Sequence, residues 1–535
     1  MKARKIFLFC FLFLCCWLQA QTLIPADGLH IVTEAVKPNG KAKLVVTGKV
    51  ANDAPGKMKA TVEVLDAERR VIMKSKSVKP AAAFTLKLPV SNVQLWSPEN
   101  PKLYTVVYTL FNGKQEVARK EEKFGFRFVN VTQERGFTVN GNDYKLRGVV
   151  WPQELPWLRN ANRECKKALL KKLSEMGCNA LSVRAADPTE DFCELCDETG
   201  MFLLVDVSQD GEGAVRESLG RLRNHPCIVL WSAGSQTFGG TEEEADRLMQ
   251  TVRIIREADS TRPVTAGLTQ VDMPLKKGLV EMLDIPGLDN SPFRYQEMYN
   301  KTQQHQLIAI RTYTYSEKER NLYQENPWVL GQFLQTNMVP LIAQTDTFYL
   351  YRSIWNKESH TLHIATHWNR AAGEHVIVPV YTDYPKAELL LNGKSLGKED
   401  KHVWQVPYEA GELTAVAYNG KGKEMQRTVL HTAAEPVHIQ ILPFYAGNLT
   451  FVTLRISDQT NNLCSDARSQ LNIDLNGTGK LWGCMLGNAM RYSDGNTLSI
   501  QPETGVCIVV IEGNGVLTVK SDGLIGGQLQ INHNR

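Results

Sequence analysis

The 535-residue sequence has no excess of either charge and no glycine-rich phosphate-binding loop. Its 61 Lys and Arg residues are nearly balanced by 57 Asp and Glu residues, and no basic cluster lies beyond the first residues. Since a nucleic-acid-binding protein needs a concentrated basic surface, this class is excluded. A nucleotide, haem or flavin cofactor is not expected either, because no glycine-rich turn joins a strand to a helix.

Metal sites and membrane helices also lack the patterns that they require. The histidines form no cluster at the spacing of zinc ligands, so no metal is expected. Cys193 and Cys196 form one Cys-x-x-Cys pair in a helical stretch, without a second pair, so we expect core cysteines. No segment beyond the first 20 residues is apolar enough to span a membrane. Nothing in the sequence specifies an oligomeric state.

The N-terminal segment has the pattern of a secretory signal. Lys2, Arg4 and Lys5 precede an apolar run over residues 6–18, and Ala20 supplies the small residue of a cleavage site. We therefore expect a signal peptide over the first 20 residues, cleaved near Ala20, and a secreted or periplasmic protein.

The order of strand and helix patterns indicates four domains after this signal. Short strands with period-two alternation, such as residues 43–47, predict an immunoglobulin-like β-sandwich over residues 21–127. Strands that alternate with helices predict a (β/α)₈ TIM-like barrel over residues 128–355. Alternating strands return afterwards, predicting a β-sandwich accessory domain over residues 356–432 and a C-terminal immunoglobulin-like β-sandwich over residues 433–535.

Short motifs at the domain junctions carry a resemblance to a known family. In chain order they are WSPENP at 96–101, FGFR at 124–127, RNHP at 223–226, VLWS at 229–232 and NPWVLG at 326–331. This ordered set resembles glycoside hydrolase family 2, the family of the β-galactosidases. The resemblance implies a barrel flanked by immunoglobulin-like domains, a carbohydrate ligand and no cofactor. The family's N-terminal jelly-roll domain is expected to be missing, because too few residues precede Gly28.

The family is a retaining O-glycoside hydrolase, which uses two carboxyl groups about 5 Å apart at the C-terminal ends of barrel strands. In the family, the catalytic acid/base is the Glu of an Asn-Glu pair. At these two positions this chain has Ser235 and Gln236. The nucleophile position corresponds to Arg311, and a register shift would give Thr312 or Tyr313. None of these is a carboxylate, and an amide cannot donate and recover a proton near neutral pH.

Other positions at which the family contacts its sugar are also substituted. Trp151 and Glu154 follow the strand where the family carries a His and an acidic group, and Gln335 replaces its sugar-stacking Trp. Trp151 is either a platform for a pyranose ring or a packing residue of the barrel rim. Arg311 would pair with an acidic sugar or, as we expect, with a structural carboxylate such as Asp206. The substrate-binding candidates are Trp151, Glu154, Ser235, Gln236, Arg311 and Gln335.

Three functions remain open. The first, favoured by the two missing carboxylates, is a catalytically inactive glycosidase fold that acts as a carbohydrate-binding or accessory protein. The second is an active O-glycoside hydrolase with atypical carboxylates. The third is a structural or adhesive scaffold whose work lies in the β-sandwiches. Candidate carboxylates for the second are Glu154, Asp187, Glu190, Asp206 and Asp289.

Overall fold

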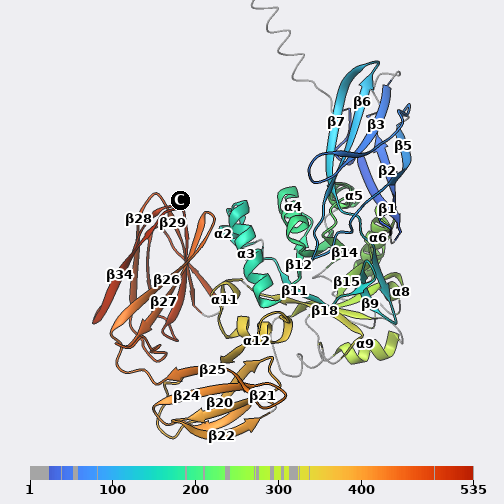
Figure 1. Cartoon of the computed structure of the whole chain (residues 1–535). Helices are drawn as coiled ribbons and strands as arrows, with labels where there is room; N and C mark the ends of the chain where they lie inside the picture. Colours follow the sequence, from blue (N-terminus) through green and yellow to red (C-terminus); the bar gives the residue numbers. More distant parts are fainter. Residues whose placement is uncertain are drawn as a thin grey trace, which may run out of the picture. The chain divides into compact units, whose positions relative to one another are not determined.

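The computed structural model describes residues 23–533 with short interruptions (Figure 1). Outside the described residues lie 1–22, 38, 52–57, 81, 153, 187–188, 209–210, 235–240, 270–271, 273–275, 277, 290–293, 303–305, 313–322, 324–325, 337, 400, 487–488 and 534–535, and the side chains of 311 and 340. The expected signal peptide is among them. The chain forms two compact units. Among the described residues, the first unit holds those up to 145, 184–310 and 324–330, and the second holds 146–183, 311–323 and 331–533.

Two antiparallel sheets form a β-sandwich at the start of the chain. One sheet has the order β1 (Leu29–Val36), β2 (Ala42–Lys49), β5 (Ala83–Val90), and the other β4 (Val71–Lys74), β3 (Met58–Leu65), β6 (Tyr104–Asn112), β7 (Gln115–Phe124). The period-two pattern of β2 directs Leu44 and Val46 into a core shared with Val62 and Val64 of β3. The alternation in the sequence therefore predicted the sandwich correctly.

Eight parallel strands then close into a barrel in chain order. They are β11 (Leu146–Val150), β12 (Ala180–Arg184), β13 (Phe202–Asp206), β14 (Ile228–Ser232), β15 (Val264–Leu268), β16 (Ile285–Asp289), β17 (Leu307–Thr312) and β18 (Val329–Gln335). The last strand pairs with the first, so that Leu146 lies opposite Gly331 and Val150 opposite Gln335. The predicted barrel is confirmed. A small sheet of β8 (Val129–Thr132), β9 (Gly136–Val139) and β10 (Asn142–Asp143) precedes it.

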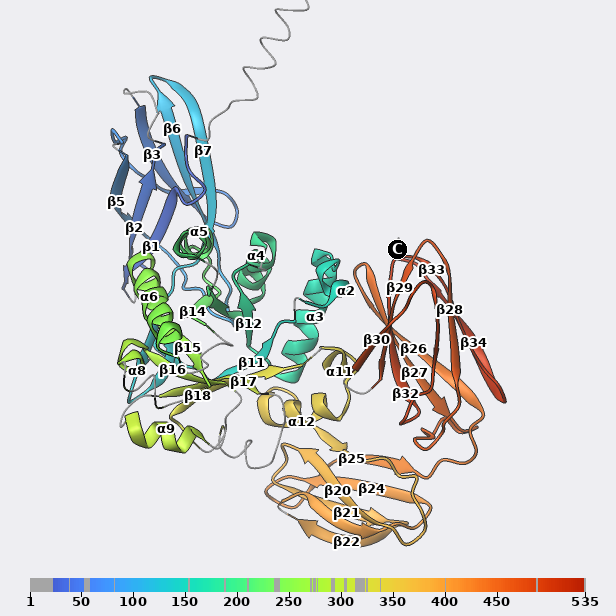
Figure 2. The same cartoon turned by 180° about the vertical axis from the view of Figure 1, so that it is seen from behind.

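Amphipathic helices cover the barrel strands, and Figure 2 shows α5 and α6 beside β14 and β15. The helices are α2 (Pro156–Arg159), α3 (Arg163–Met176), α4 (Glu190–Thr199), α5 (Glu212–Leu222), α6 (Glu242–Ala258), α8 (Leu279–Met282), α9 (Tyr295–Thr302), α11 (Val339–Ile342) and α12 (Asp346–Trp355). Helix α6 begins with a reciprocal cap, in which Thr241 and Glu244 each accept a hydrogen bond from the other's backbone N–H. Within the described part of the chain, no helix has the length and apolarity to cross a membrane.

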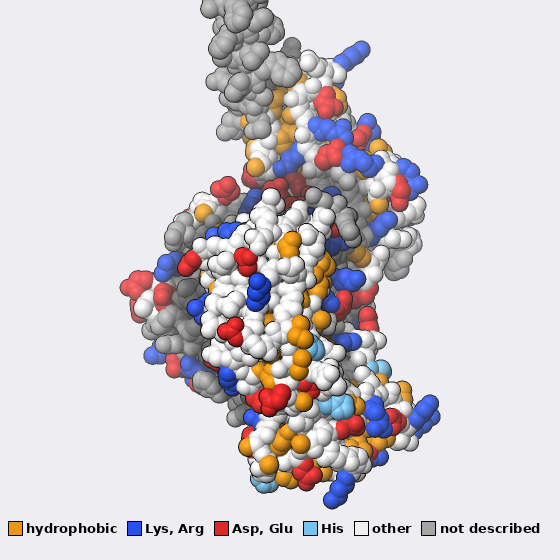
Figure 3. Space-filling view, turned by 90° about the vertical axis from the view of Figure 1, so that its left-hand side faces the viewer, with side chains coloured by type: hydrophobic (Ala, Val, Ile, Leu, Met, Phe, Trp, Pro, Cys, Tyr) orange, Lys and Arg blue, Asp and Glu red, His pale blue; other side chains and the backbone are white. Residues whose placement is uncertain are grey.

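Two further β structures follow the barrel. The first has the sheets β19 (Leu362–Ile364), β20 (His375–Thr382), β23 (Val403–Pro407) and β22 (Lys394–Glu399), β21 (Lys386–Leu391), β24 (Glu412–Tyr418), β25 (Glu424–His431). The second, the C-terminal sandwich, has the order β30 (Ala489–Tyr492), β29 (Lys480–Leu486), β32 (Val506–Glu512), β27 (Leu449–Ser457), β26 (His438–Ala446), β34 (Leu524–Ile531), β33 (Gly515–Ser521), β28 (Leu471–Gly477), β31 (Thr497–Ile500). Its face in Figure 3 is largely uncharged, with scattered Lys, Arg, Asp and Glu side chains.

The cysteines of the described residues are all buried and unpaired. Cys193 and Cys196 lie on the buried face of α4, fully enclosed, as expected for core residues. Burial raises the pKa of the Cys193 thiol well above its ordinary value. The Cys-x-x-Cys pair therefore contributes packing rather than a reactive thiolate.

Candidate carbohydrate site in the barrel

Barrel strands of the first unit end in polar side chains that are almost fully buried. They are Asp206 on β13, Ser232 on β14 and Asp289 on β16. Backbone bonds continue just past these ends, from Val207 N to Ser232 O (2.9 Å) and from Ala233 N to Thr265 O (2.9 Å). A (β/α)₈ barrel builds its site at this C-terminal end, so the polar ends form the floor of a candidate site.

The two carboxylates of this floor are both only 3% exposed. One oxygen of Asp206, Oδ1, accepts a hydrogen bond from Ser208 N at 2.8 Å, which shapes the turn after β13. Asp289 ends β16, and two strands, β14 and β15, separate β16 from β13 in the barrel. These carboxylates are therefore embedded in the strand ends and lie on strands that are not neighbours.

The barrel strands of the second unit contribute an aromatic residue and an amide. Trp151 directly follows β11, is 5% exposed and donates its backbone N–H to Ser182 O at 2.9 Å. This burial favours packing at the barrel rim over an open sugar platform. Gln335 ends β18, and its buried Oε1 has no hydrogen-bond partner among the described residues. Thr312, at the end of β17, donates its hydroxyl to Phe333 O at 3.3 Å. The amide oxygen of Gln335 is thus free to accept from a ligand hydroxyl.

Several predicted site residues fall where the structure gives no side-chain position. Ser235 and Gln236, two and three residues beyond Ala233, lie outside the described residues, and so does Asp187. For Arg311 the backbone alone is described, within β17. Its expected pairing with Asp206 stays a prediction. Glu154 is described and exposed.

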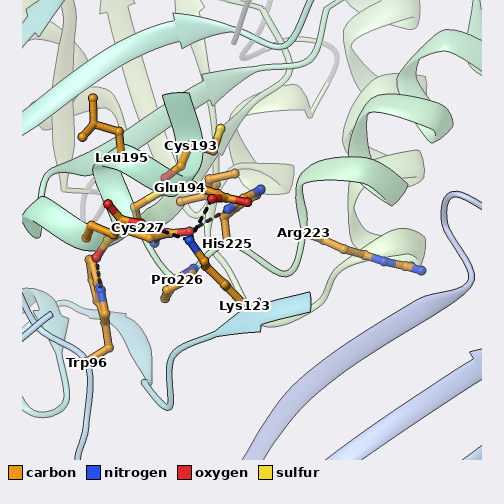
Figure 4. Close-up of polar contacts among 12 residues, drawn as sticks. Trp96, Lys123, Cys193, Glu194, Leu195, Arg223, His225, Pro226 and Cys227 are labelled. Atoms are coloured by element: carbon orange, nitrogen blue, oxygen red, sulfur yellow. Dashed lines mark hydrogen bonds and ion pairs between the residues drawn. The ribbon is translucent and has the colours of Figure 1, made fainter. Parts of the chain in front are cut away.

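The RNHP motif before β14 is a structural anchor rather than part of the site (Figure 4). His225 Nδ1 lies 2.6 Å from Oδ2 of Asp197 on α4, and Cys227 N donates to the other oxygen at 2.9 Å. Trp96 of the WSPENP motif donates its indole N–H to the backbone oxygen of Asp197 at 2.8 Å. Burial alone would lower the pKa of His225, but the Asp197 charge and hydrogen bond raise it above its ordinary value. Asp197 therefore joins two motifs, WSPENP and RNHP, to helix α4.

This role of Asp197 was not anticipated from the sequence. The available signal was an acidic residue in the buried stripe of an amphipathic helix, where a charge requires partners. Neighbouring motif residues act in the same way. The side-chain oxygen of Asn224 accepts a hydrogen bond from Ile31 N (3.1 Å), and its side-chain nitrogen donates one to Leu29 O (2.8 Å), both on β1. Arg127 of the FGFR motif donates to the backbone oxygens of Pro226 and Ile228.

Trp231 lies inside β14 and is a core residue. It is fully buried, and its indole N–H donates to Asp259 Oδ2 at 2.9 Å. Arg262 forms an ion pair with Asp259, and its guanidinium lies 5.5 Å from the Trp231 ring centre. Although burial would raise it, the pKa of Asp259 is held below its usual range by Arg262. The indole of Trp231 is therefore committed to the framework.

The described residues contain no group of three or more His, Cys, Asp or Glu side chains that could hold a metal ion. The barrel strands themselves present buried hydroxyl, amide and carboxylate groups. Hydroxyl and amide groups can both donate hydrogen bonds to a hydroxyl-rich ligand and accept them from it, and an ionised carboxylate can accept them.

Comparison with known protein families matches three segments of the chain. The model of glycosyl hydrolases family 2 matches residues 26–127, and the TIM barrel domain model of the same family matches residues 207–358. A domain of unknown function, DUF4982, matches residues 373–426, which begin just before β20.

Relatives and solved structures agree with these matches. Beta-galactosidase BoGH2A of Bacteroides ovatus is 25% identical over 94% of this chain and 75% of its own length. A putative beta-glucuronidase of Formosa agariphila is 26% identical over 71% of this chain, which spans 46% of that relative. A crystal structure of a glycosyl hydrolase family 2 member from Bacteroides cellulosilyticus superposes with a TM-score of 0.79 at 24% identity, covering 95% of this chain and 79% of that one.

The closed eight-stranded barrel with flanking β-sandwiches is the architecture of a glycoside hydrolase. With both family 2 models matching in order, the chain belongs to glycoside hydrolase family 2 and is β-galactosidase- and β-glucuronidase-like.

Proposed function

We propose that this chain is a family 2 protein that binds carbohydrate at the end of its barrel without hydrolysing it. The observation that carries the proposal is the end of β17, where Ile310, Arg311 and Thr312 provide no carboxyl group. A retaining glycosidase requires a carboxylate nucleophile at such a strand end, within about 5 Å of the acid/base.

The acid/base position supports the same proposal. Strand β14 ends at Ser232, and Gln236 stands four residues further along, where the family's pattern has Glu. The amide of Gln236 does not ionise near neutral pH, so it cannot act as the acid/base. It can still donate a hydrogen bond to a sugar hydroxyl and accept one from it. A barrel end that lacks both catalytic carboxyl groups but keeps polar side chains could bind a sugar without hydrolysing it.

Active hydrolysis by other carboxylates is the second candidate, and the described residues give it little support. Asp206 and Asp289 are each only 3% exposed and are embedded in the strand ends, and Oδ1 of Asp206 already accepts a hydrogen bond from Ser208 N. Glu190 is the first residue of α4, where a negative charge stabilises the helix. The third candidate, a scaffold built from the β-sandwiches, would leave the buried Gln335 amide without a use.

The relatives suggest which sugars to test. One is named a beta-galactosidase and another a putative beta-glucuronidase, so β-galactosides and β-glucuronides are the ligand classes that we propose. The predicted signal over the first 20 residues places this binding in the periplasm or outside the cell. N-terminal sequencing of the exported protein, with cleavage expected near Ala20, tests the location.

Turnover and binding are measured on the same purified protein. We expect no hydrolysis of chromogenic β-galactoside, β-glucuronide or β-mannoside, and a melting temperature that rises with the matching free sugar. Gln335→Ala should abolish this shift, whereas Gln405→Ala, an exposed glutamine of β23, should not. Hydrolysis that survives Gln236→Ala and Arg311→Ala would overturn the proposal, because other carboxylates would then carry it.

A further inference from the structure

A second pocket is lined by residues that follow the last barrel strand and lies wholly within the second unit. It has a volume of about 920 Å³ and is lined by residues between α11 and α12, by β19 and β25 with the segment after β19, and by the C-terminal sandwich. A pocket of this size accommodates a small organic ligand or a short oligosaccharide. None of its residues belongs to the candidate site in the barrel.

One wall of this pocket is the outer face of the C-terminal sandwich. On β27, Val452, Leu454 and Ile456 point into the sandwich core, so the alternate residues Thr453 and Arg455 point outward into the pocket. Across the sheet, Thr453 lies opposite Ile508 of β32, and Ile508 lies opposite Met485 of β29. Ile508 and Met485 also line the pocket. The wall thus combines an apolar strip with one cationic side chain.

The charge of Arg455 is not compensated within the described residues. No ion pair or hydrogen bond of its guanidinium is present there, and burial lowers its pKa from the ordinary value without an opposing acidic group. The other charged residues of the pocket are paired: Arg370 with Glu374 (3.3 Å), and Asp346 with His363 (2.6 Å). A half-buried guanidinium without a partner is costly, and an anion would relieve that cost.

Two deeply buried polar groups of the pocket also lack partners. Trp368 is 2% exposed and Ser465 is 5% exposed, and neither the indole Nε1 nor the hydroxyl Oγ has a hydrogen-bond partner in the described part of the chain. Buried polar atoms are nearly always satisfied in folded proteins, so an unpaired donor in a pocket indicates a ligand or ordered water. Both can donate a hydrogen bond to a ligand oxygen.

We propose that this pocket is an accessory glycan-binding site for a saccharide that carries an anionic group, such as the carboxylate of a uronic acid. Arg455 binds the anionic group, Trp368 and Ser465 donate to ring or hydroxyl oxygens, and Ile508 and Met485 contact the apolar face of the sugar. The saccharide class rests on the function proposed above, whereas the anion requirement rests on this pocket alone.

Isothermal titration calorimetry of the whole chain tests the proposal with cellobiouronic acid, a disaccharide with one carboxylate, and with neutral cellobiose. We expect the acid to bind at least about 10-fold more tightly, with an affinity that falls as salt is added. Arg455→Gln should weaken binding of the acid at least about 10-fold. Arg491→Gln, an exposed arginine of β30 in the same sandwich, is the matched control and should bind as the wild type does.

The outcomes separate this site from the barrel. Equal binding of acid and cellobiose, or an Arg455→Gln variant that binds normally, overturns the pocket proposal. Binding of the acid that is lost in Gln335→Ala and kept in Arg455→Gln assigns the ligand to the barrel and also overturns it. Loss in Arg455→Gln alone supports the pocket even where the barrel binds no sugar. Glucose 6-sulfate, titrated in parallel, distinguishes a sulfate-bearing glycan from a uronate.

Discussion

His225 and Asp197 form a buried contact in which the imidazole Nδ1 lies 2.6 Å from the carboxylate Oδ2. It ties the RNHP turn before β14 to helix α4, and Asp197 Oδ1 holds the backbone of Cys227 at the same point (Figure 4). Lys123 of β7 adds ion pairs to Glu194 (2.8 Å) and Glu198 (3.0 Å) of the same helix. One side of α4 is thus fixed by polar contacts.

The His225 contact predicts a pH-dependent stability. Its folded pKa is raised above the ordinary value of about 6.5. The stabilisation is therefore fully present below about pH 6.5 and is lost as pH rises through the folded pKa. In thermal unfolding, His225→Asn should lower the melting temperature more at about pH 6 than at about pH 9. His375→Asn, an exposed histidine of β20, should show no such trend. A pH-independent deficit of His225→Asn would contradict the prediction.

The buried ion pair of Asp259 and Arg262 predicts a large stability loss on removal of one partner. The side chains are 0% and 5% exposed, so Arg262→Met leaves an uncompensated charge and should cost about 3–5 kcal/mol in denaturant unfolding. The nearby Arg256–Asp284 pair (3.1 Å) is exposed, and Arg256→Met should cost at most about 1 kcal/mol. Equal losses would show that burial does not decide the difference.

Gly331 of the NPWVLG motif is required by a close approach between β18 and β11. A Cβ on Gly331 would lie 2.4 Å from the backbone oxygen of Leu146. Gly331→Ala should therefore destabilise the protein by about 1–3 kcal/mol. Gly213, in the first turn of α5, has open space around it, and Gly213→Ala should stabilise by about 0.5–1 kcal/mol. Chemical denaturation of both variants measures the change in the free energy of unfolding, which should have opposite signs. A Gly331→Ala variant as stable as the wild type would refute the close approach.

The buried cysteines predict low thiol reactivity in the folded protein. Burial raises the pKa of Cys178 to about 12 and of Cys464 to about 11, so little thiolate forms near neutral pH. Iodoacetamide should leave the eight buried cysteines unmodified until guanidinium is added, as mapped by mass spectrometry. Rapid labelling of Cys193 or Cys196 in the folded state would restore a redox function for that pair.

Much of the fold was predictable because its signals are local. Period-two alternation in residues 43–47 specified a strand with one buried face, and the regular change between strands and helices specified the barrel. That Gln236 and Arg311 stand at the positions of the two catalytic carboxylates stays a prediction, because the side chains of both lie outside the described residues.

The partners of buried charges were not predictable in this way. The sequence marked Asp197 only as part of a helix end, and gave no sign that it binds His225 and Trp96, 28 and 101 residues away. Likewise the alternation of β27 places Arg455 outward, but only the fold shows that no acidic side chain of the described residues pairs with it.

The sequence by itself thus determined the elements and their order. These depend on residue type and on the periodicity of neighbouring residues, which are properties of short segments. The tertiary structure alone decided that the RNHP turn is an anchor, that Trp151 is buried, and that Trp368 and Arg455 share a pocket. Burial and pairing depend on distant segments that meet only when the chain is folded, so no local pattern encodes them.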